Sequence, residues 1–374
     1  MTKRSEIVFA PRYHAPLAGR TARLVIVSPD GGTMTQSAEQ ARRGARLKDV
    51  AEAAGVSVAT ASKALNDRDD VHPATRRRVL EAAERLSFTP NALAQTLHSG
   101  RSGTVGLITH DLEGRFSIPI LMGAEDSFGA GKMSIFLCDA RGDAIRQMHH
   151  LQALLSRRVD GLIIVGSRTD PRPPVATDAP VPVVYVYAPS ERAEDLSFVP
   201  DNVGAGRLVT EHLLSLGRRK IAHIAGDTSY AATHDRVEGI RATLAEAGVQ
   251  LVGEKPWYGS WSESWGRAAA ASLLTSDPAV DAIICGSDQI ARGVLESLRE
   301  AGRRVPDDIA VASFDNWEIL ATGSRPQLTS VDMRFEALGQ RAARAIFAAL
   351  EGREDSGVHV EPCRLVVRGS TIGS

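Results

Sequence analysis

The chain has 374 residues, of which 43% are hydrophobic, so it is long enough for two or three domains that each bury a core. Its 44 Lys and Arg residues are balanced by 45 Asp and Glu residues, which excludes a global electrostatic attraction to nucleic acid or to a membrane. Any DNA binding must therefore come from a local surface. The three cysteines, Cys138, Cys285 and Cys363, lack the spacing of metal ligands, so neither a metal nor a cofactor is expected.

Residues 1–44 mix Pro, Gly, Arg and Ser with one short apolar run, and this composition predicts a mobile arm. No run approaches the roughly 20 apolar residues that a membrane span needs. The N-terminal residues also lack the apolar segment of a signal peptide. The sequence therefore predicts a cytoplasmic protein without a membrane partner.

A small all-helical domain is predicted at residues 45–90. Apolar residues recur at helical spacing from Leu47 to Ala54, and Gly55 ends this first helix. Ser57 is a favourable N-cap for a second helix that reaches Leu65. A third helix is expected to begin near Pro73. Its predicted buried face consists of Val79, Leu80, Ala83 and Leu86, with Phe88 closing the core.

From Thr104 onward, short β-rich runs alternate with helical stretches, which is typical of an α/β fold with parallel sheets covered by helices on both faces. The predicted strands are 105–109, 134–138, 161–165, 181–187, 220–225, 282–285 and 309–314. A polar break from Pro189 to Pro200 lies midway and indicates two similar lobes.

Several motifs together resemble the LacI/GalR family of bacterial repressors. They are Leu47-Lys48-Asp49-Val50-Ala51, Gly55-Val56-Ser57, Thr75-Arg76, Phe88-Thr89-Pro90-Asn91-Ala92-Leu93-Ala94 and Arg368-Gly369-Ser370-Thr371. The resemblance implies a helix-turn-helix DNA-binding domain at 45–90, a hinge helix and linker at 91–103, and a two-lobed core at 104–374 like that of periplasmic binding proteins. Lobe 1 is then expected at about 104–198 and 327–354, and lobe 2 at about 199–326 and 355–374.

The second helix of a helix-turn-helix enters the major groove of DNA. The resemblance assigns base contacts to Val58, Ala59 and Lys63, and phosphate contacts to Ser57, Thr60, Ser62 and Asn66. Val58 and Ala59 offer only apolar contact, for example to a thymine methyl group, whereas Lys63 donates hydrogen bonds to guanine. The alternative is that Val58 and Ala59 simply pack inside the helical domain.

Residues 91–97 resemble the family's hinge helix, which folds when two copies meet in the minor groove. Asn91, Ala94 and Leu97 are the predicted DNA contacts, with Leu97 as an apolar wedge between base pairs. The alternative is that Leu97 packs under the core. His72 departs from the family pattern, because it occupies the place of a Ser N-cap.

An effector site is implied between the two lobes. Asp235-Arg236 with Gly239 resembles the family segment whose arginine binds ligand hydroxyls or carboxylates. Asp315 matches the family's hydroxyl acceptor, and Trp261 the indole that stacks on the ligand. Further candidates are Phe116, Tyr187, Phe198 and Asp288. Ser287 stands where the family often has Asn, which weakens any specific sugar assignment, and the alternative for each charged candidate is a solvated loop or a salt bridge.

The sequence disfavours two other classes of protein. An enzyme is disfavoured because the sequence lacks a Gly-x-Ser-x-Gly elbow, a phosphate-binding Gly-x-x-x-x-Gly-Lys loop and a His-Glu-x-x-His zinc pair. A periplasmic sugar receptor is disfavoured by the DNA reader and by the absence of a signal peptide. The sequence thus predicts a homodimeric regulator, a repressor more than an activator, that binds operator DNA and a sugar-like effector. Arg236→Ala is expected to abolish the effector response and to leave folding intact.

Overall fold

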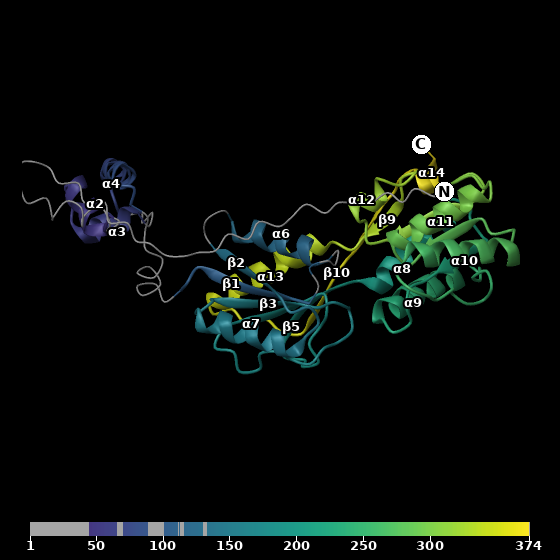
Figure 1. Cartoon of the computed structure of the whole chain (residues 1–374), viewed down its shortest axis with the longest axis horizontal. Helices are drawn as coiled ribbons and strands as arrows, with labels where there is room; N and C mark the ends of the chain where they lie inside the picture. The colour runs from purple at the N-terminus through teal and green to yellow at the C-terminus, as the bar shows by residue number, and fades with distance from the viewer. Residues whose placement is uncertain are drawn as a thin grey trace, which may run out of the picture. The chain divides into compact units, whose positions relative to one another are not determined.

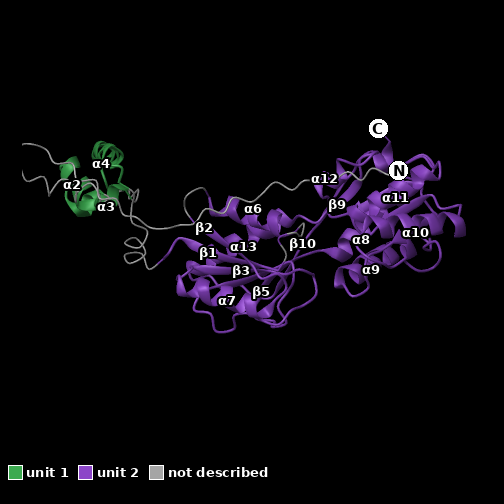
Figure 2. Ribbon diagram, in the orientation of Figure 1, with its two compact units in different colours: residues 1–90 green, residues 91–374 purple. Residues whose placement is uncertain are grey.

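The computed structural model describes residues 45–65, 70–88, 101–110, 112, 116–129 and 133–373. The chain divides into two compact units, residues 1–90 and 91–374 (Figure 2). The expected arm at 1–44, Asn66 and the hinge positions Asn91, Ala94 and Leu97 lie outside the described residues. Within the described part of the chain, no helix is both long enough and apolar enough to cross a membrane.

The described residues of the first unit form the helices α2 (Leu47–Ala54), α3 (Val58–Leu65) and α4 (Pro73–Arg85). Gly55 ends α2 in the left-handed conformation with φ of 62°, which glycine adopts without steric cost. The Ser57 hydroxyl accepts the Thr60 backbone N–H at 3.1 Å, which confirms the predicted N-cap of α3. His72 replaces the expected Ser cap of α4, because its Nδ1 accepts the Ala74 N–H at 3.3 Å.

The core of this unit is small and built mostly from alanine and valine. Its buried residues come from all three helices, and Phe88 packs against them as predicted. The predicted buried face of α4 is partly wrong, because Leu80 is 45% exposed and Leu86 is 36% exposed. The residues that α4 buries are Val79, Ala82 and Ala83. Leu80 lies about 100° around the helix from Val79, so it points toward solvent when Val79 points inward.

Lobe 1 of the second unit is a six-stranded parallel sheet in the order β10-β5-β4-β3-β1-β2 (Figure 1). Its elements are β1 (Thr104–Thr109), α6 (Ser117–Phe128), β2 (Ser134–Asp139), α7 (Ala144–Ser156), β3 (Gly161–Val165), β4 (Val183–Val186), β5 (Leu196–Pro200), α13 (Phe335–Leu350) and β10 (Val358–Glu361). Side chains of β3 alternate between the two faces: Ile163 and Val165 join the core under α6 and α13, and Leu162 and Ile164 the core under α7. The predicted two-sided parallel sheet is therefore confirmed.

Lobe 2 is a five-stranded sheet in the order β11-β9-β8-β7-β6, parallel except where β11 pairs with β9. Its elements are α8 (Asn202–Ser215), β6 (Ile221–Ile224), α9 (Ala231–Glu246), α10 (Glu263–Ser276), β7 (Ala282–Cys285), α11 (Asp288–Glu300), β8 (Ala310–Phe314), α12 (Glu318–Ala321), β9 (Thr329–Asp332), β11 (Arg364–Val366) and α14 (Gly369–Ile372). Helices cover both faces here too, with α8 and α9 on one side and α10 and α11 on the other.

The chain crosses between the lobes three times, and two crossings differ from the expected boundaries. The segment 329–332 pairs with β8 in lobe 2, although residues from 327 were expected in lobe 1. The segment 358–361 pairs with β5 in lobe 1, although residues from 355 were expected in lobe 2. Both segments are four-residue strands between longer helices or loops, and their local sequence carries no signal that selects one sheet over the other.

Candidate functional site

The carboxyl ends of β6, β7 and β8 lie together at one edge of the lobe 2 sheet. Gly226 follows β6 and Gly286 follows β7, and a Cβ on Gly286 would lie 2.9 Å from the Gly226 nitrogen. Asp315 follows β8 directly. Because ligands of open α/β sheets bind at the carboxyl ends of the strands, this edge is where a ligand is expected.

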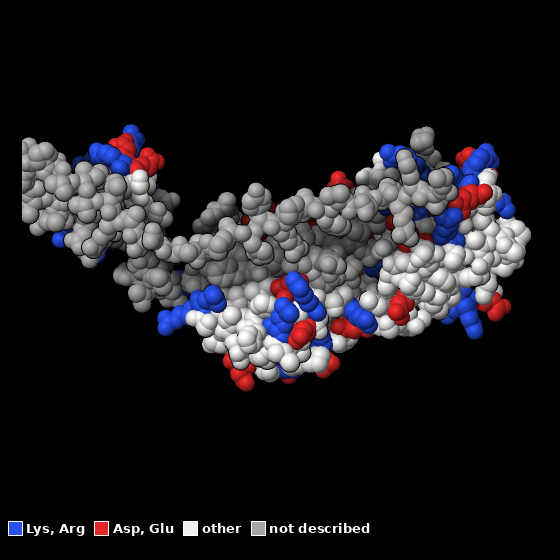
Figure 3. Space-filling model, viewed as in Figure 1, with Lys and Arg blue, Asp and Glu red and all other residues white. Residues whose placement is uncertain are grey.

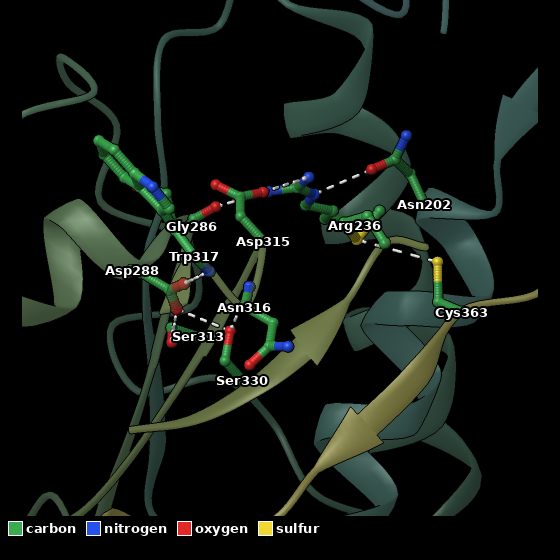
Figure 4. A network of polar contacts seen from close by, with 12 residues as sticks. Asn202, Arg236, Gly286, Asp288, Ser313, Asp315, Asn316, Trp317, Ser330 and Cys363 are labelled. Atoms are coloured by element: carbon green, nitrogen blue, oxygen red, sulfur yellow. Dashed lines mark hydrogen bonds and ion pairs between the residues drawn. The ribbon is translucent and has the colours of Figure 1, made fainter. Parts of the chain in front are cut away.

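Arg236 occupies this edge and is only 4% exposed. Its Nε donates to Asn202 Oδ1 at 2.9 Å, its Nη1 to the Gly286 carbonyl at 2.7 Å and its Nη2 to Asp315 Oδ1 at 3.2 Å (Figure 4). Its guanidinium carbon lies 4.6 Å from the centre of the Phe314 ring. These contacts use three of the five guanidinium N–H groups, so the buried cation keeps donors for a further acceptor.

Close packing of two helices puts Arg236 in this place. A Cβ on Gly239 of α9 would lie 2.0 Å from the Val203 carbonyl oxygen of α8, and a Cβ on Gly206 would lie 2.4 Å from the Arg236 carbonyl oxygen. The two backbones can touch only because both positions are glycine. Residues three positions apart lie about one turn apart on the same side of a helix. Gly239 and Arg236 can therefore both face α8, where Gly239 contacts its backbone and Arg236 binds Asn202.

The Trp261 indole covers Gly226, where a Cβ would meet ring atoms at 2.4 Å. The Tyr230 ring packs against it edge-on, with centroids 5.5 Å apart and an interplanar angle of 72°. The Trp261 Nε1 atom is buried and has no hydrogen-bond partner among the described residues. A buried donor without a protein acceptor costs free energy, so this N–H favours a further acceptor beside it. The structure thus brings the predicted residues Arg236, Asp315 and Trp261 to neighbouring strand ends.

Asp288 departs from its predicted place in the effector site. It is fully buried, and its oxygens accept the Ser313 hydroxyl at 2.5 Å, the Ser330 hydroxyl at 2.6 Å and the Trp317 backbone N–H at 2.6 Å (Figure 4). Burial, and then the charge of Asp315, raises the pKa of Asp288 to about 7. Because its hydrogen bonds go to the protein, Asp288 supports the loop after β8 and does not face a ligand.

Lobe 1 contributes an aromatic cluster. Phe116 stacks on Tyr187 with centroids 4.7 Å apart, and Phe335 packs on both rings at 4.9 and 5.7 Å. Tyr187 directly follows β4 and has a φ of 75°, an unusual conformation for a bulky residue that a functional site can retain. The predicted candidates Phe116 and Tyr187 therefore lie together.

Phe198 is a correction to the predicted site, although its carbonyl accepts the Tyr187 N–H at 2.9 Å. It is 3% exposed in the middle of β5. Its ring packs under the Arg341 guanidinium, 4.8 Å from the ring centre, and 5.3 Å from the His359 ring. Because packing covers both sides of this ring, it has no face left for a ligand. The role of Phe198 is therefore in the core.

The segment after β3 in lobe 1 contacts the first turn of α9 in lobe 2. The Arg168 guanidinium lies 4.0 Å from the centre of the Tyr230 ring, and Asp170 Oδ1 accepts the Ala231 backbone N–H at 3.2 Å. Asp170 thus caps α9, whose own N-cap residue Tyr230 supplies no side-chain cap. Thr169 Oγ1, Asp170 Oδ2 and Arg172 Nε are buried polar atoms without a partner among the described residues.

The exposed face of α3 is the second candidate surface. Val58 is 46% exposed and Ala59 is exposed, while Ala61 and Ala64 supply the buried side. Val58 and Ala59 therefore do not pack in the core, which removes the alternative reading of these residues. Lys63 is exposed and pairs with Asp70, and the Ser57 hydroxyl is used as the cap of α3. Elsewhere in the described chain, the face in Figure 3 shows basic and acidic side chains intermixed without a large patch of either sign.

Sequence reasoning missed the residues that complete these groups. Asn202 and Phe314 contact Arg236, Tyr230 contacts Trp261, and Phe335 completes the lobe 1 cluster. Asn202 opens α8 directly after a crossing between the lobes, and Phe314 directly precedes Asp315. Their positions at strand and helix ends were the available signal, but Asn202 lies 34 residues along the chain from its partner Arg236.

Two family models match the chain. Residues 46–91 match the model described as bacterial regulatory proteins, lacI family, and residues 210–371 match the model described as a periplasmic binding protein-like domain. The HTH-type transcriptional regulator CelR of Thermobifida fusca is 34% identical over 334 residues, which cover 87% of this chain and 96% of CelR. The chain belongs to the LacI family of bacterial regulatory proteins.

Other members of the LacI family agree over the full length. Catabolite control protein A of Priestia megaterium is 32% identical, with 87% of this chain and 98% of that protein covered. The crystal structure of the lac repressor dimer bound to operator and the anti-inducer ONPF has a TM-score of 0.70 and 27% identity, covering 88% of this chain and all of that chain. A CelR–cellobiose complex has a TM-score of 0.62 and 30% identity, covering 87% and 99%. The predicted fold, a helix-turn-helix domain followed by a two-lobed α/β core, is confirmed.

Proposed function

We propose that this chain is a cytoplasmic repressor that binds an operator as a homodimer and responds to a sugar or sugar derivative held between its two lobes. The observation that carries the effector part is the group formed by buried Arg236 and Asp315 and half-buried Trp261, which offers donors, an acceptor and an apolar ring face at one sheet edge. Polar groups around the ring of a sugar and the apolar faces of its C–H groups match this combination. The CelR–cellobiose complex supports a sugar as the class of ligand.

Calorimetry of the full chain against a defined panel of mono- and disaccharides, cellobiose included, tests the effector. We expect at least one sugar to bind, and Trp261→Ala to weaken its binding at least tenfold, since the indole supplies a ring face and the unpartnered Nε1 donor. Tyr258→Ala is the control, because Tyr258 is an exposed aromatic residue of the same lobe. Binding of every sugar with the same affinity in Trp261→Ala would place the effector elsewhere.

The DNA part of the proposal rests on the exposed face of α3. Ser57, Val58, Ala59, Thr60, Ser62, Lys63 and Asn66 are the proposed contacts of this domain, and Asn91, Ala94 and Leu97 those of the hinge. Selection of binding sites from random duplex DNA by the full chain is expected to yield a nearly palindromic sequence, because a two-fold symmetric dimer contacts two matching half-sites. Selection of a single, asymmetric half-site would contradict dimeric binding. A reporter with the selected site upstream of a promoter then distinguishes repression from activation.

An exposed apolar surface supports the homodimer. Ile118 and Met122 of α6 and Phe136 and Leu137 of β2 are 36 to 51% exposed, and β2 is the edge of its sheet. Exposed apolar edge strands invite pairing and are covered in stable proteins. We expect Phe136→Asp to shift the mass measured by light scattering from dimer to monomer and the matched exposed change Ile372→Asp to leave the dimer intact. A monomeric wild-type chain would refute the dimer.

A further inference from the structure

One motif of the sequence, Arg368-Gly369-Ser370-Thr371, has no part in the DNA surface or in the effector contacts. After β11 it packs against β8 and β9. The Ser370 hydroxyl donates to the Val311 carbonyl at 2.6 Å and accepts the Thr329 N–H at 2.8 Å, and the Thr371 and Thr329 hydroxyls are 2.7 Å apart. The residues that make these contacts are all buried: Val311, Thr329, Ser370 and Thr371. The motif is therefore anchored in lobe 2.

From this anchored motif, the Arg368 side chain extends to the loop that follows β8. Its Nη1 donates to the Leu328 carbonyl at 2.8 Å and its Nη2 to Asn316 Oδ1 at 2.7 Å. Asn316 is the neighbour of Asp315, the carboxylate that pairs with Arg236. Arg368 therefore connects the end of the chain to the effector site through one side-chain hydrogen bond.

The loop that Arg368 reaches has an unusual backbone. Asp315 has a φ of 93° and Asn316 a φ of 47°, so two consecutive residues other than glycine lie in the left-handed region. Such conformations are uncommon for residues other than glycine and persist where surrounding contacts hold them. The direction of the Asp315 carboxylate depends on this turn, because the backbone reverses immediately after β8.

Backbone and side-chain contacts hold the turn, and its first residue, Asp315, donates its N–H to the Val331 carbonyl at 2.9 Å. The Asn316 N–H donates to the Ser330 hydroxyl at 2.9 Å, and the Trp317 N–H donates to Asp288 Oδ2 at 2.6 Å (Figure 4). These two contacts bind the backbone. A further contact, from Arg368, binds the Asn316 side chain.

We propose that Arg368 is a positioning residue of the effector site, which holds the left-handed Asp315–Asn316 turn and thereby aims the Asp315 carboxylate at Arg236 and at the effector. The part that concerns the effector rests on the proposed function above. The part that concerns the turn does not, so each has its own test.

Hydrogen exchange of the ligand-free full chain tests the turn. In Arg368→Ala we expect the Asn316 and Trp317 amides to exchange at least about tenfold faster, while the β6 amides keep their wild-type rates. Arg364→Ala is the matched control, because Arg364 lies on the neighbouring strand β11 and pairs with Asp332 at the surface. Unchanged rates at Asn316 and Trp317 would overturn the proposal. A uniform increase over all of lobe 2 would also overturn it, because it would show a purely structural role.

A second variant separates the Asn316 contact from the Leu328 contact. Asn316→Gly keeps the left-handed conformation accessible and removes the acceptor of the Arg368 hydrogen bond. In the Asn316→Gly background, Arg368→Ala is expected to add no further increase at the Trp317 amide. An equal increase in both backgrounds would show that Arg368 acts through Leu328, which contradicts the proposal.

Sugar binding tests the consequence for the effector, with cellobiose and the other sugars of the panel as probes. For a sugar that the wild-type chain binds, Arg368→Ala is expected to raise the dissociation constant about tenfold, Arg368→Lys less, and Arg364→Ala not at all. Unchanged affinity in Arg368→Ala would overturn the effector part. If the wild-type chain binds no sugar of the panel, the sugar assignment of the proposed function fails, and the exchange rates still decide whether Arg368 holds the turn.

Discussion

The DNA-reading face of α3 and the lobe 2 site differ in how their side chains are held. On α3 the proposed base contacts fall within six consecutive residues, lie at the surface and have few partners: Val58 and Ala59 are exposed, and Lys63 has one surface ion pair. In lobe 2, Arg236 and Asp315 are buried and bonded to groups 34 to 79 residues away.

This difference separates two kinds of consequence of a mutation. A side chain at the surface of a helix can be exchanged with little change in folding, so its variants report on binding alone. A buried charged side chain is part of a network, so its variants alter folding and binding together. Four predictions test this contrast.

The largest effect is expected at Arg236. The sequence alone suggested that Arg236→Ala would leave folding intact, but the burial of the Arg236–Asp315 pair changes that expectation. Removal of Arg236 takes the cationic partner away from a buried carboxylate, so we expect the free energy of unfolding to fall by about 3–5 kcal/mol. Urea denaturation measures it, with Arg241→Ala as the control because Arg241 lies exposed on the same helix. Equal urea midpoints for Arg236→Ala and wild type would contradict the expected difference between buried and exposed side chains.

The next effect is the pH dependence due to Asp288. Its pKa rises from 3.8 to about 7, so between these values the folded chain binds a proton that the unfolded chain has released, and the stability contributed by this group falls as pH rises from about 4 to 7. Burial lowers the pKa of His223 from 6.5 to about 4, and this group contributes stability that rises with pH over about 4 to 6.5. As pH rises, the two groups therefore change the free energy of unfolding in opposite directions.

Asp288→Asn removes the loss of stability with rising pH that is due to Asp288. The gain of stability with rising pH that is due to His223 then remains. We expect its free energy of unfolding to rise with pH between about 4 and 6.5 more steeply than that of the wild type, with a difference of at most about 4 kcal/mol across the range. Denaturation curves recorded at several pH values measure it. Parallel pH profiles for the two proteins would show that Asp288 is ionised throughout and that its burial does not disfavour the charge.

A smaller effect is expected at Gly239. A Cβ there would lie 2.0 Å from the Val203 carbonyl oxygen, so Gly239→Ala must push α9 away from α8 and weaken the Arg236–Asn202 hydrogen bond. Overpacking of this kind costs about 1–3 kcal/mol. Thermal denaturation of Gly239→Ala beside Glu238→Ala, an exposed position on the same helix, measures it. A Gly239→Ala protein as stable as the control would show that the two helices can separate without strain.

The smallest change in stability is expected on α3. Lys63→Ala removes one exposed ion pair with Asp70, so the free energy of unfolding should change by no more than about 0.5 kcal/mol. Sequence preference in the random-DNA selection should nevertheless relax at one base pair of each half-site. Asp70→Asn is the matched variant, which keeps Lys63 and removes its partner, and it should retain that preference and bind DNA somewhat more tightly. An unchanged preference in Lys63→Ala would remove Lys63 from the base contacts.

The local sequence determined much of this protein. Helical spacing located α2, α3 and α4, Ser57 and Gly55 marked their ends, and the alternation of β-rich and helical runs identified the α/β core. These features depend on neighbours within a few residues, through periodicity, capping and backbone conformation. The motif resemblance added Arg236, Trp261 and Asp315 as candidate site residues, and the structure has these residues at neighbouring strand ends.

Only the tertiary structure decided how the distant residues meet. The segments 329–332 and 358–361 join lobes other than the expected ones, because strand pairing is a choice between two sheets that a four-residue segment does not encode. Asp288 supports the loop and Phe198 packs in the core, because burial and hydrogen-bond partners are set by elements far along the chain. Arg368 reaches Asn316 across 52 residues, a contact that no periodicity in either segment predicts.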